Sequence, residues 1–234
     1  MNKGYFNTTQ KEIEKKNYHI FIGISLGVLK PLTKEMAKEY IDWALKNTKN
    51  DIVILIADEI AKFNYRVFSQ YSEGKSLRRA LKEGDKYEHF FKEIKKEFSE
   101  QEKKKILILK WKDIWNEQKE KIRMKLEEKY KSNKEFRKII TSFVKKYAEK
   151  RGKKLSEEKF DYLSQYILAE LPTLLDGIKY KNEKYNLLVY PTFVHSGMSD
   201  FVINVEAGKI FPELKKELNL EKSVAIVEFH LSTK

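Results

Sequence analysis

Five short runs of aliphatic and β-branched residues, separated by stretches with helical periodicity, constrain the fold of this 234-residue chain most strongly. These runs are typical of β-strands, and they span residues 18–26, 51–57, 105–110, 186–193 and 223–231. The first three are almost continuously apolar, which favours strands buried on both faces of a parallel sheet. Strands that alternate with helices along the chain predict an α/β protein.

Helical patterns fill the segments between these runs. Thr33 is placed to cap the helix that follows the first strand. Residues 77–98 and 136–148 carry apolar side chains three and four positions apart, as a helix packed on a core does. Because no Pro-rich or Gly-rich linker interrupts the chain, we expect a single domain over residues 1–234, with residues 119–154 as a basic helical elaboration between the third and fourth strands.

An excess of positive charge is the strongest signal in the composition. The chain has 48 Lys and Arg against 35 Asp and Glu, a net charge of +13. Residues 119–154 hold fifteen basic and five acidic residues, so they account for +10 of this charge. A second cluster without an acidic residue consists of Lys75, Arg78, Arg79 and Lys82. Such clusters predict a polyanionic partner, although lysine-rich helix faces are also often merely solvated.

Several kinds of chemistry are excluded or disfavoured by residues that the chain lacks. It has no cysteine and only four histidines, so thiol chemistry is excluded and we expect no metal site. Neither a GxxxxGK[ST] loop nor a GxGxxG motif is present, and we therefore expect no nucleotide cofactor. The apolar runs are far shorter than the roughly 20 residues of a membrane-spanning helix, and the polar N-terminus does not resemble a secretory signal. These features predict a cytoplasmic protein without a membrane partner.

A candidate nucleophile lies at the end of the first predicted strand, in the sequence Gly23-Ile24-Ser25-Leu26-Gly27. In open α/β sheets ligands bind at the carboxyl ends of strands, and the flanking glycines allow the backbone to expose the Ser25 hydroxyl. A simple Gly/Ser turn is the alternative interpretation. The string also matches the G-x-S-x-G motif of α/β-hydrolases, but Pro31 stands where the helix of that motif would begin at once.

Two further candidates follow later in the chain. Tyr166 and Glu170 are four residues apart in a predicted helix, so both project from one face, and a carboxylate beside a phenol can accept or relay a proton. The apolar residues after Glu170 predict that it is buried. Tyr190 ends the fourth predicted strand, where it can face Ser25 across the sheet. His195 is a lone histidine, expected to make local hydrogen bonds.

Taken in order, these residues resemble the cyclodipeptide synthases, whose Rossmann-like fold is similar to the catalytic domains of class I tyrosyl- and tryptophanyl-tRNA synthetases. Gly23-x-Ser25 corresponds to the nucleophile strand, Tyr166-x-x-x-Glu170-Leu171-Pro172 to the helix motif, and Tyr190 follows Glu170 at the family's spacing of twenty residues. Val28 and Pro191 match the branch written XYP rather than the larger branch, which has Asn and Gln at these positions. The resemblance implies a mostly parallel five-stranded sheet flanked by helices.

The resemblance also implies an activity. Two aminoacyl-tRNAs would be the substrates and a cyclic dipeptide the product, without ATP or another cofactor. Ser25 would be acylated by the first substrate, Glu170 and Tyr166 would hold the α-amino group of that acyl unit, and Tyr190 would relay a proton. The cluster of Lys75, Arg78, Arg79 and Lys82 would bind tRNA, and we expect a monomer. The lining of the first side-chain pocket would include Phe21, Gly23, Val53, Leu55, Leu107, Thr173 and Leu188, with His195 at the second pocket.

Two other functions are compatible with the residues themselves. A serine hydrolase built on Gly23-x-Ser25-x-Gly27 would cleave esters without RNA and would need a catalytic histidine such as His195 or His230. A non-catalytic RNA-binding module would retain tRNA and release no product.

Overall fold

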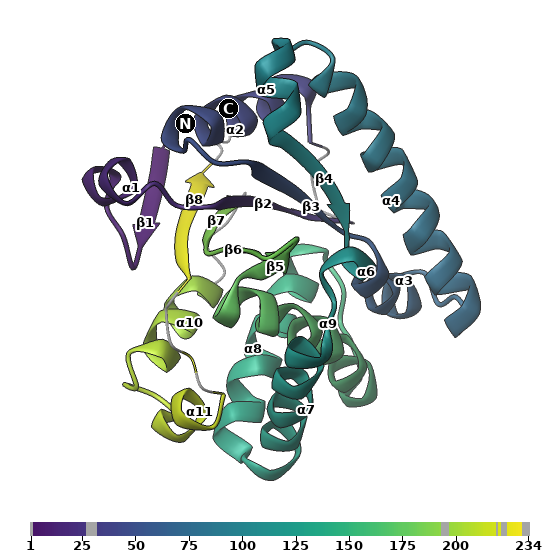
Figure 1. Ribbon diagram of the computed structural model, residues 1–234. Helices are drawn as coiled ribbons and strands as arrows, with labels where there is room; N and C mark the ends of the chain where they lie inside the picture. The colour runs from purple at the N-terminus through teal and green to yellow at the C-terminus, as the bar shows by residue number, and fades with distance from the viewer. Residues whose placement is uncertain (1, 27–31, 193–196, 219, 221–223, 231–234) are drawn as a thin grey trace.

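A six-stranded sheet forms the centre of the molecule, with helices on both of its faces (Figure 1). The computed structural model describes residues 2–26, 32–192, 197–218, 220 and 224–230. Its strands are β1 (Asn2–Phe6), β2 (Ile20–Ser25), β3 (Ile52–Ala57), β4 (Ile106–Lys110), β5 (Ile178–Tyr180), β6 (Glu183–Tyr185), β7 (Leu187–Thr192) and β8 (Ala225–His230). Its helices are α1 (Gln10–Lys16), α2 (Lys34–Asn47), the short 3₁₀ helix η1 (Glu59–Ala61), α3 (Lys62–Phe68), α4 (Glu73–Lys95), α5 (Glu100–Lys105), α6 (Trp111–Ile114), α7 (Glu117–Ser132), α8 (Lys134–Lys150), α9 (Glu157–Asp176), α10 (Met198–Glu206) and α11 (Pro212–Glu217).

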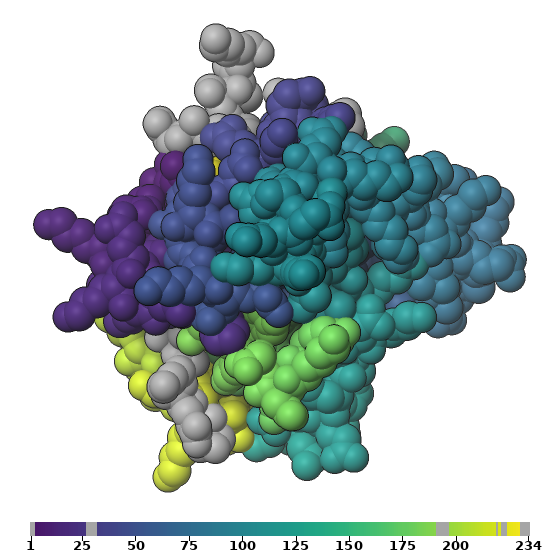
Figure 2. Space-filling view, turned by 45° about the horizontal axis from the view of Figure 1, so that its top comes forward, coloured from purple at the N-terminus to yellow at the C-terminus, as the bar shows by residue number. Residues whose placement is uncertain are grey.

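The sheet is mainly parallel and has the strand order β1-β8-β7-β2-β3-β4. All five predicted strands are present, and β1 adds a sixth that runs antiparallel to β8. The expected count of five was therefore one too low. The sequence of β1 is NKGYF, and it lacks the apolar run that marks the central strands because it lies at one edge of the sheet. The hairpin β5–β6 was also not predicted; it lies on the outside of the molecule (Figure 2).

The expectation that the first three predicted strands are buried on both faces is correct for β3, in which all six residues are buried. For β4 it is wrong, because only Ile106 and Leu109 are buried. The reason is position: β4 ends the sheet order, so one side of the strand has no neighbour and its side chains are covered less completely.

Alternation along β2 divides the core into two halves. Ile20, Ile22 and Ile24 pack with α2 and α4 on one face of the sheet. On the opposite face Phe21 packs with the helices that include α9. Since Ser25 shares the parity of Phe21, it points toward α9. The parallel strands end at one edge, and this arrangement brings Ser25 and the end of β7 together.

Helices α7 and α8 form most of the predicted elaboration over residues 119–154, and both pack against α9. The predicted apolar stripe of α8 is confirmed, since Phe136, Ile140 and Val144 are buried. Most cations of this segment are exposed, but Lys119 is buried. Its ammonium group donates hydrogen bonds to the backbone carbonyls of Pro172, at 3.3 Å, and Gly177. The elaboration is thereby joined to the end of α9.

Among the described residues, none of the helices combines the length and the apolar character that crossing a bilayer requires.

Candidate active site

Ser25 is the last residue of β2, where it pairs in register with Ala57 of β3. Its side chain lines one cavity together with Tyr166 and Tyr190, and its interaction with both phenol groups acts to lower their pKa. Tyr190 comes from β7, the neighbour of β2 in the sheet, and Tyr166 comes from α9. The structure thus brings together three of the four predicted catalytic side chains from three separate elements.

Glu170 is the fourth predicted group, and it lies one turn after Tyr166 on α9. The predicted helix extends from Glu157 to Asp176, and the residues from Leu168 to Leu175 are all buried. Glu170 itself is only 7% exposed, and Tyr166 only 9%. The prediction that the apolar sequence around Glu170 buries it is therefore confirmed.

Burial changes the proton affinity of this group of side chains. Desolvation raises the pKa of Glu170 to about 7. The pKa of Tyr166 is raised well above 10, mainly by burial and then by the charge of Glu170. The pKa of Tyr190 is also raised, and here the charge of Glu170 is the largest cause. At neutral pH both phenols keep their protons, whereas Glu170 exchanges its proton readily, as a general acid or base must.

A cavity of about 150 Å³ opens beside these residues and is called the larger cavity below. Its wall contains the four predicted catalytic residues, Leu26 directly after β2, and side chains of α3, α8, α9 and α10: Asn64, Phe143, Val144, Tyr147, Leu163, Ile167 and Met198. The apolar stripe of α8 predicted that this face of the helix packs in the core. The same face forms one wall of the cavity. Asn64 was not predicted, because nothing in its sequence neighbourhood distinguishes it from other polar residues of a short helix.

A smaller cavity of about 20 Å³ lies on the sheet side of Ser25. Five predicted pocket residues line it: Phe21, Gly23, Leu55, Thr173 and Leu188. Val53 and Leu107 are not among its lining residues; they pair with each other in register, one row farther from the end of the sheet than Leu55, and pack in the core. His195 lies outside the described residues, so the structure places no side chain for it.

The predicted tRNA-binding residues Lys75, Arg78, Arg79 and Lys82 all lie on α4, and all four are exposed. The ammonium group of Lys75 is 4.1 Å from the ring centroid of Tyr71. Arg79 forms an ion pair with Glu83 at 3.6 Å, one residue beyond the acid-free stretch. The cluster is therefore an accessible cationic surface at the start of a long helix.

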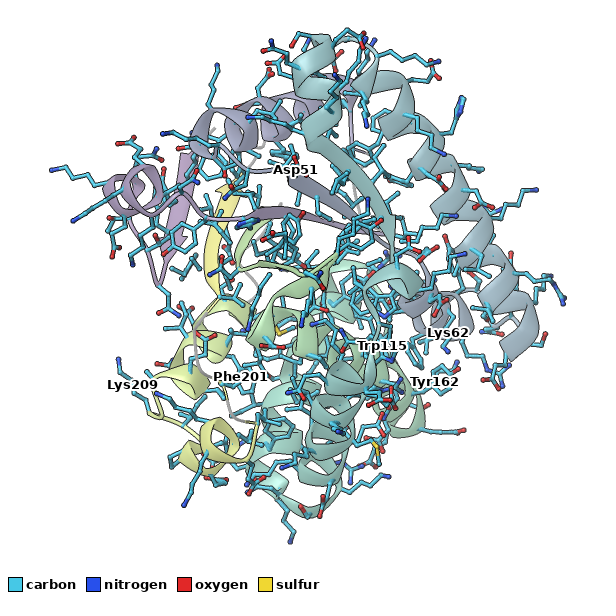
Figure 3. The ribbon with its side chains drawn as sticks, viewed as in Figure 1. Asp51, Lys62, Trp115, Tyr162, Phe201 and Lys209 are labelled. Carbon is cyan, nitrogen blue, oxygen red and sulfur yellow. The ribbon has the colours of Figure 1, made fainter. Side chains whose placement is uncertain are left out.

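A further arginine stands next to the larger cavity. Arg151 donates a hydrogen bond of 2.8 Å to the hydroxyl of Tyr147, and its guanidinium lies 4.8 Å from the ring centroids of Tyr147 and Phe68. Tyr162 of α9 packs edge-on against Phe63 of α3, with 5.5 Å between the ring centroids. Figure 3 labels Tyr162 together with Lys62, the first residue of α3. Arg151 is thus joined to the wall of the larger cavity through Tyr147.

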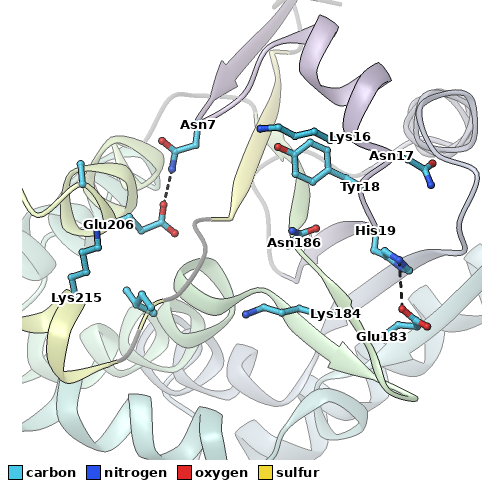
Figure 4. A pocket seen from close by; sticks show the side chains of 12 residues that line it. Asn7, Lys16, Asn17, Tyr18, His19, Glu183, Lys184, Asn186, Glu206 and Lys215 are labelled. Atoms are coloured by element: carbon cyan, nitrogen blue, oxygen red, sulfur yellow. Dashed lines mark hydrogen bonds and ion pairs between the residues drawn. The ribbon is translucent and has the colours of Figure 1, made fainter.

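A further hollow of the molecule is not part of this site. It is a polar groove of about 900 Å³ whose lining includes His19 and Asn186, the residues just before β2 and β7 (Figure 4). Ser25 is at the opposite end of β2, so the groove and the candidate active site lie at opposite edges of the sheet. Within the described residues, no three His, Asp or Glu side chains gather closely enough to hold a metal ion.

The fold and the site together define a Rossmann-like enzyme with a serine, two phenols and a buried carboxyl group at the carboxyl edge of its sheet. Residues 5–205 match the family model described as cyclodipeptide synthase, and the chain therefore belongs to the cyclodipeptide synthase family. It is accordingly an enzyme of the aminoacyltransferase class. No curated protein is similar to this chain in sequence. The XYP branch remains a prediction, since Val28 lies outside the described residues.

Solved structures share the fold at low sequence identity. A cyclodipeptide synthase from Bacillus thermoamylovorans is 18% identical, with a TM-score of 0.72 over 99% of this chain and 96% of that one. A Mycobacterium tuberculosis protein, described as demonstrating that cyclodipeptide synthetases are related to type I tRNA synthetases, is 16% identical, with a TM-score of 0.65 over 84% and 83%. The cyclodipeptide synthase from Candidatus Glomeribacter gigasporarum, bound to Phe-tRNAPhe, is 14% identical, with a TM-score of 0.57 over 92% and 89%.

Proposed function

We propose that this enzyme joins the amino acids of two aminoacyl-tRNAs into a cyclic dipeptide, a 2,5-diketopiperazine, by a ping-pong mechanism through Ser25. The observation that carries the proposal is the convergence of Ser25, Tyr166, Tyr190 and the buried Glu170 on one cavity, in a chain of this family. An aminoacyl-tRNA is already an activated ester, so neither ATP nor another cofactor is needed.

In the first transfer, Ser25 Oγ attacks the ester carbonyl of one aminoacyl-tRNA. A new ester bond to Oγ forms, the bond to the ribose oxygen breaks, and the proton of the Ser25 hydroxyl ends on that oxygen. The side chain of the acyl group is directed at the smaller cavity, between Gly23, Thr173 and Leu188, and this cavity of about 20 Å³, which holds about one water molecule, must widen to admit it. In this assignment, the predicted pocket residues that line the smaller cavity bind the side chain of the first acyl group.

In the second transfer, the α-amino group of the aminoacyl-Ser25 intermediate acts as the nucleophile. Glu170 and Tyr166 hold this group, and the Glu170 carboxylate takes the proton that the ammonium must lose before it can attack. A carboxyl group with a pKa of about 7 is suited to this exchange at neutral pH. The amine attacks the ester of the second aminoacyl-tRNA, an amide bond forms as the bond to the ribose oxygen breaks, and one amine proton ends on that oxygen. The tRNA leaves, and a dipeptidyl-Ser25 intermediate remains.

Cyclisation is an intramolecular attack. The free α-amino group of the dipeptide attacks the Ser25 ester, the second amide bond closes the ring, and Oγ regains a proton. Tyr190 relays this proton, because it lines the same cavity as Ser25 and its phenol remains protonated at neutral pH. The dipeptide is held next to its own ester, so no further activation is required.

For the tRNA, we assign the first contact to the exposed cations of α4. The net charge of +13 favours a polyanion, and the structural neighbour bound to Phe-tRNAPhe supports tRNA as that polyanion. The basic segment over residues 119–154 receives no residue-level role. Of the other two functions, the hydrolase differs in needing a catalytic histidine such as His195 or His230, which the variants below test.

The proposal is tested by incubating the protein with a charged tRNA pool and searching for diketopiperazines by mass spectrometry. We expect product with the wild-type protein and none with Ser25→Ala. A protein that binds tRNA but releases no product from any aminoacyl-tRNA would be an RNA-binding module. Ester cleavage of uncharged model substrates without RNA, lost in His195→Ala or His230→Ala, would indicate a hydrolase.

A further inference from the structure

Asn64 is a buried amide in the wall of the larger cavity. It is only 6% exposed, and its Oδ1 atom has no hydrogen-bond partner among the described residues. A buried acceptor without a partner lowers stability and is rare in folded proteins. The polar atom is therefore retained at a cost, at a position that adjoins Ser25 through the cavity.

The backbone around Asn64 is held firmly. Asp58, directly after β3, accepts hydrogen bonds from the backbone N–H groups of Glu59 at 2.9 Å and Trp111 at 3.2 Å. These bonds fix the start of η1, and α3 continues from η1 without a break. Phe63 and Val67 of α3 are buried in the same core as α9. Asn64 is consequently part of a preorganised wall of the cavity.

Other buried polar atoms without partners serve as a comparison. The hydroxyl of Tyr40 is one, but Tyr40 packs on the opposite face of the sheet, away from both cavities. Thr173 Oγ1 is another, and it lines the smaller cavity. Each of the two cavities at Ser25 therefore contains one unpartnered buried polar atom, contributed by Asn64 in the larger and by Thr173 in the smaller.

The other polar groups of the larger cavity have different roles. In the proposed function Ser25, Tyr166, Glu170 and Tyr190 act on the first acyl group and on the protons, and the Tyr147 hydroxyl accepts a hydrogen bond from Arg151. The rest of the wall is mainly apolar. A cavity of about 150 Å³ in a protein core is large enough to hold a six-membered carbon ring. Its dimensions and chemistry suit an acyl group that presents one hydrogen-bond donor to Asn64.

We propose that Asn64 positions the second aminoacyl group, with its Oδ1 atom accepting a hydrogen bond from the α-ammonium group of that substrate. This inference rests on the proposed function, in which the smaller cavity takes the side chain bound to Ser25 and the larger one remains for the second substrate. The α-ammonium is the donor that every aminoacyl-tRNA carries. An acyl group that displaces water from Asn64 must replace the hydrogen bonds of that water or bind more weakly.

Asn64→Leu separates this role from the rest of the chemistry, because leucine keeps the approximate volume and removes the polar atoms. With enzyme in excess over one charged tRNA, the first transfer is followed as acyl-enzyme by rapid quench and intact-protein mass spectrometry. A second charged tRNA is then titrated, and the diketopiperazine is quantified. We expect acylation within about twofold of wild type, and second-transfer efficiency at low tRNA reduced about tenfold to a hundredfold. Asn64→Asp, which keeps an acceptor oxygen, should recover part of this loss.

The Tm distinguishes a role in substrate binding from a purely structural role, because replacing a structural asparagine would lower the Tm. Removing an unpartnered buried group should leave the Tm of Asn64→Leu equal to or above that of wild type. Tyr40→Phe is the matched control, because it also removes an unpartnered buried polar group but should leave both transfers unchanged. Unchanged second transfer in Asn64→Leu, equal losses in both transfers, or no recovery in a folded Asn64→Asp would overturn the inference. If wild type forms no acyl-enzyme at all, it is the proposed function that fails instead.

Discussion

At the scale of single residues, Glu170 is the side chain whose protonation state the proposed chemistry depends on. It is a carboxyl group buried beside two phenols, and burial raises its pKa to about 7. In the proposed mechanism it must be ionised to take a proton from the α-ammonium group. Its environment therefore determines the pH range in which the second transfer proceeds.

The rate of cyclodipeptide formation should rise as the pH increases through about 7, because the carboxylate is the form that accepts the proton. Glu170→Gln should lower the rate by about a hundredfold or more and abolish this pH dependence. The measurement is the initial rate from pH 5.5 to 8.5, corrected for the spontaneous hydrolysis of the charged tRNA. Glu158→Gln, an exposed change at the start of α9, is the control, and a pH profile shared by wild type and Glu170→Gln would contradict the role.

The stability of the folded protein should change with pH in the opposite direction to the rate, because of the same Glu170 carboxyl group. The folded-state pKa of Glu170 lies above its unfolded value of about 4.3, so the folded protein binds this proton more tightly. Its contribution to stability is present below pH 4 and is lost as the pH rises through about 7. Glu170→Gln should therefore have a higher Tm than wild type at pH 8, in spite of its low activity. A lower Tm at that pH would show that the carboxylate is stabilised by its surroundings.

Gly23 tests the smaller cavity. A Cβ atom at this position would lie 3.2 Å from Leu188 Cδ1 and 3.8 Å from Tyr190 Cδ2, so alanine crowds the cavity. We expect Gly23→Ala to slow acylation of Ser25 about tenfold or more, since one methyl group in a tight pocket has an effect of this order. Adding Leu188→Val removes the closest carbon atom and should restore part of the rate. If Gly23→Ala is as active as wild type, the smaller cavity does not receive the acyl side chain.

The helix that carries Tyr166 and Glu170 depends on a neighbouring element. Lys119 of α7 binds the carbonyl groups of Pro172 and Gly177 near the end of α9. Lys119→Met leaves these two acceptors unpaired and should reduce the free energy of unfolding by about 1–3 kcal/mol, measured with urea. Lys121→Met, an exposed change on the same helix, should stay within about 0.5 kcal/mol of wild type.

A pH series distinguishes the buried ammonium from simple loss of packing. Burial lowers the pKa of Lys119 to about 8, below the unfolded value of about 10.4. The folded protein thus releases this proton first, and the contribution of Lys119 to stability should increase as the pH rises from 8 to 10. The difference in unfolding free energy between wild type and Lys119→Met should widen over this range. A constant difference would mean that Lys119 keeps its proton in the folded protein over this range, so that burial does not lower its pKa.

Elements differed in how well the sequence predicted them. Apolar runs and helical spacing located β2, β3 and α9, because these elements are buried and their patterns are continuous. The edge strands were predicted less well: β1 was missed, and β4 was predicted to be more deeply buried than it is. Edge position depends on the order of strands in space, which no local pattern encodes.

The site residues that lie at the ends of strands or on one face of a helix could be predicted from the sequence. Ser25, Tyr190 and the pair on α9 meet this condition, and the structure brings them together. Asn64 does not, because its place in the cavity results from the packing of α3 against α9. Val53 and Leu107 were assigned to the pocket from the resemblance alone, and the depth of a residue along a strand cannot be seen without the register.

At the scale of the whole molecule, charge is expected to govern the encounter with tRNA. The double variant Arg78→Ala/Lys82→Ala should raise the KM for aminoacyl-tRNA and reduce the dependence of log(kcat/KM) on log[salt] by about 1–2, while leaving kcat unchanged. Lys86→Ala/Lys92→Ala removes two cations farther along α4 that pair with acidic residues, and it is the control. Equal effects of both variants would assign tRNA binding to net charge rather than to the cluster.

The central claim is that Ser25 becomes acylated by an aminoacyl-tRNA. Intact-protein mass spectrometry after rapid mixing of excess enzyme with one charged tRNA tests it most directly. The account predicts a mass increase equal to one aminoacyl residue, located by peptide mapping on the segment that contains Ser25 and absent in Ser25→Ala. Formation of diketopiperazine without such an adduct, or an adduct that persists in Ser25→Ala, would contradict it.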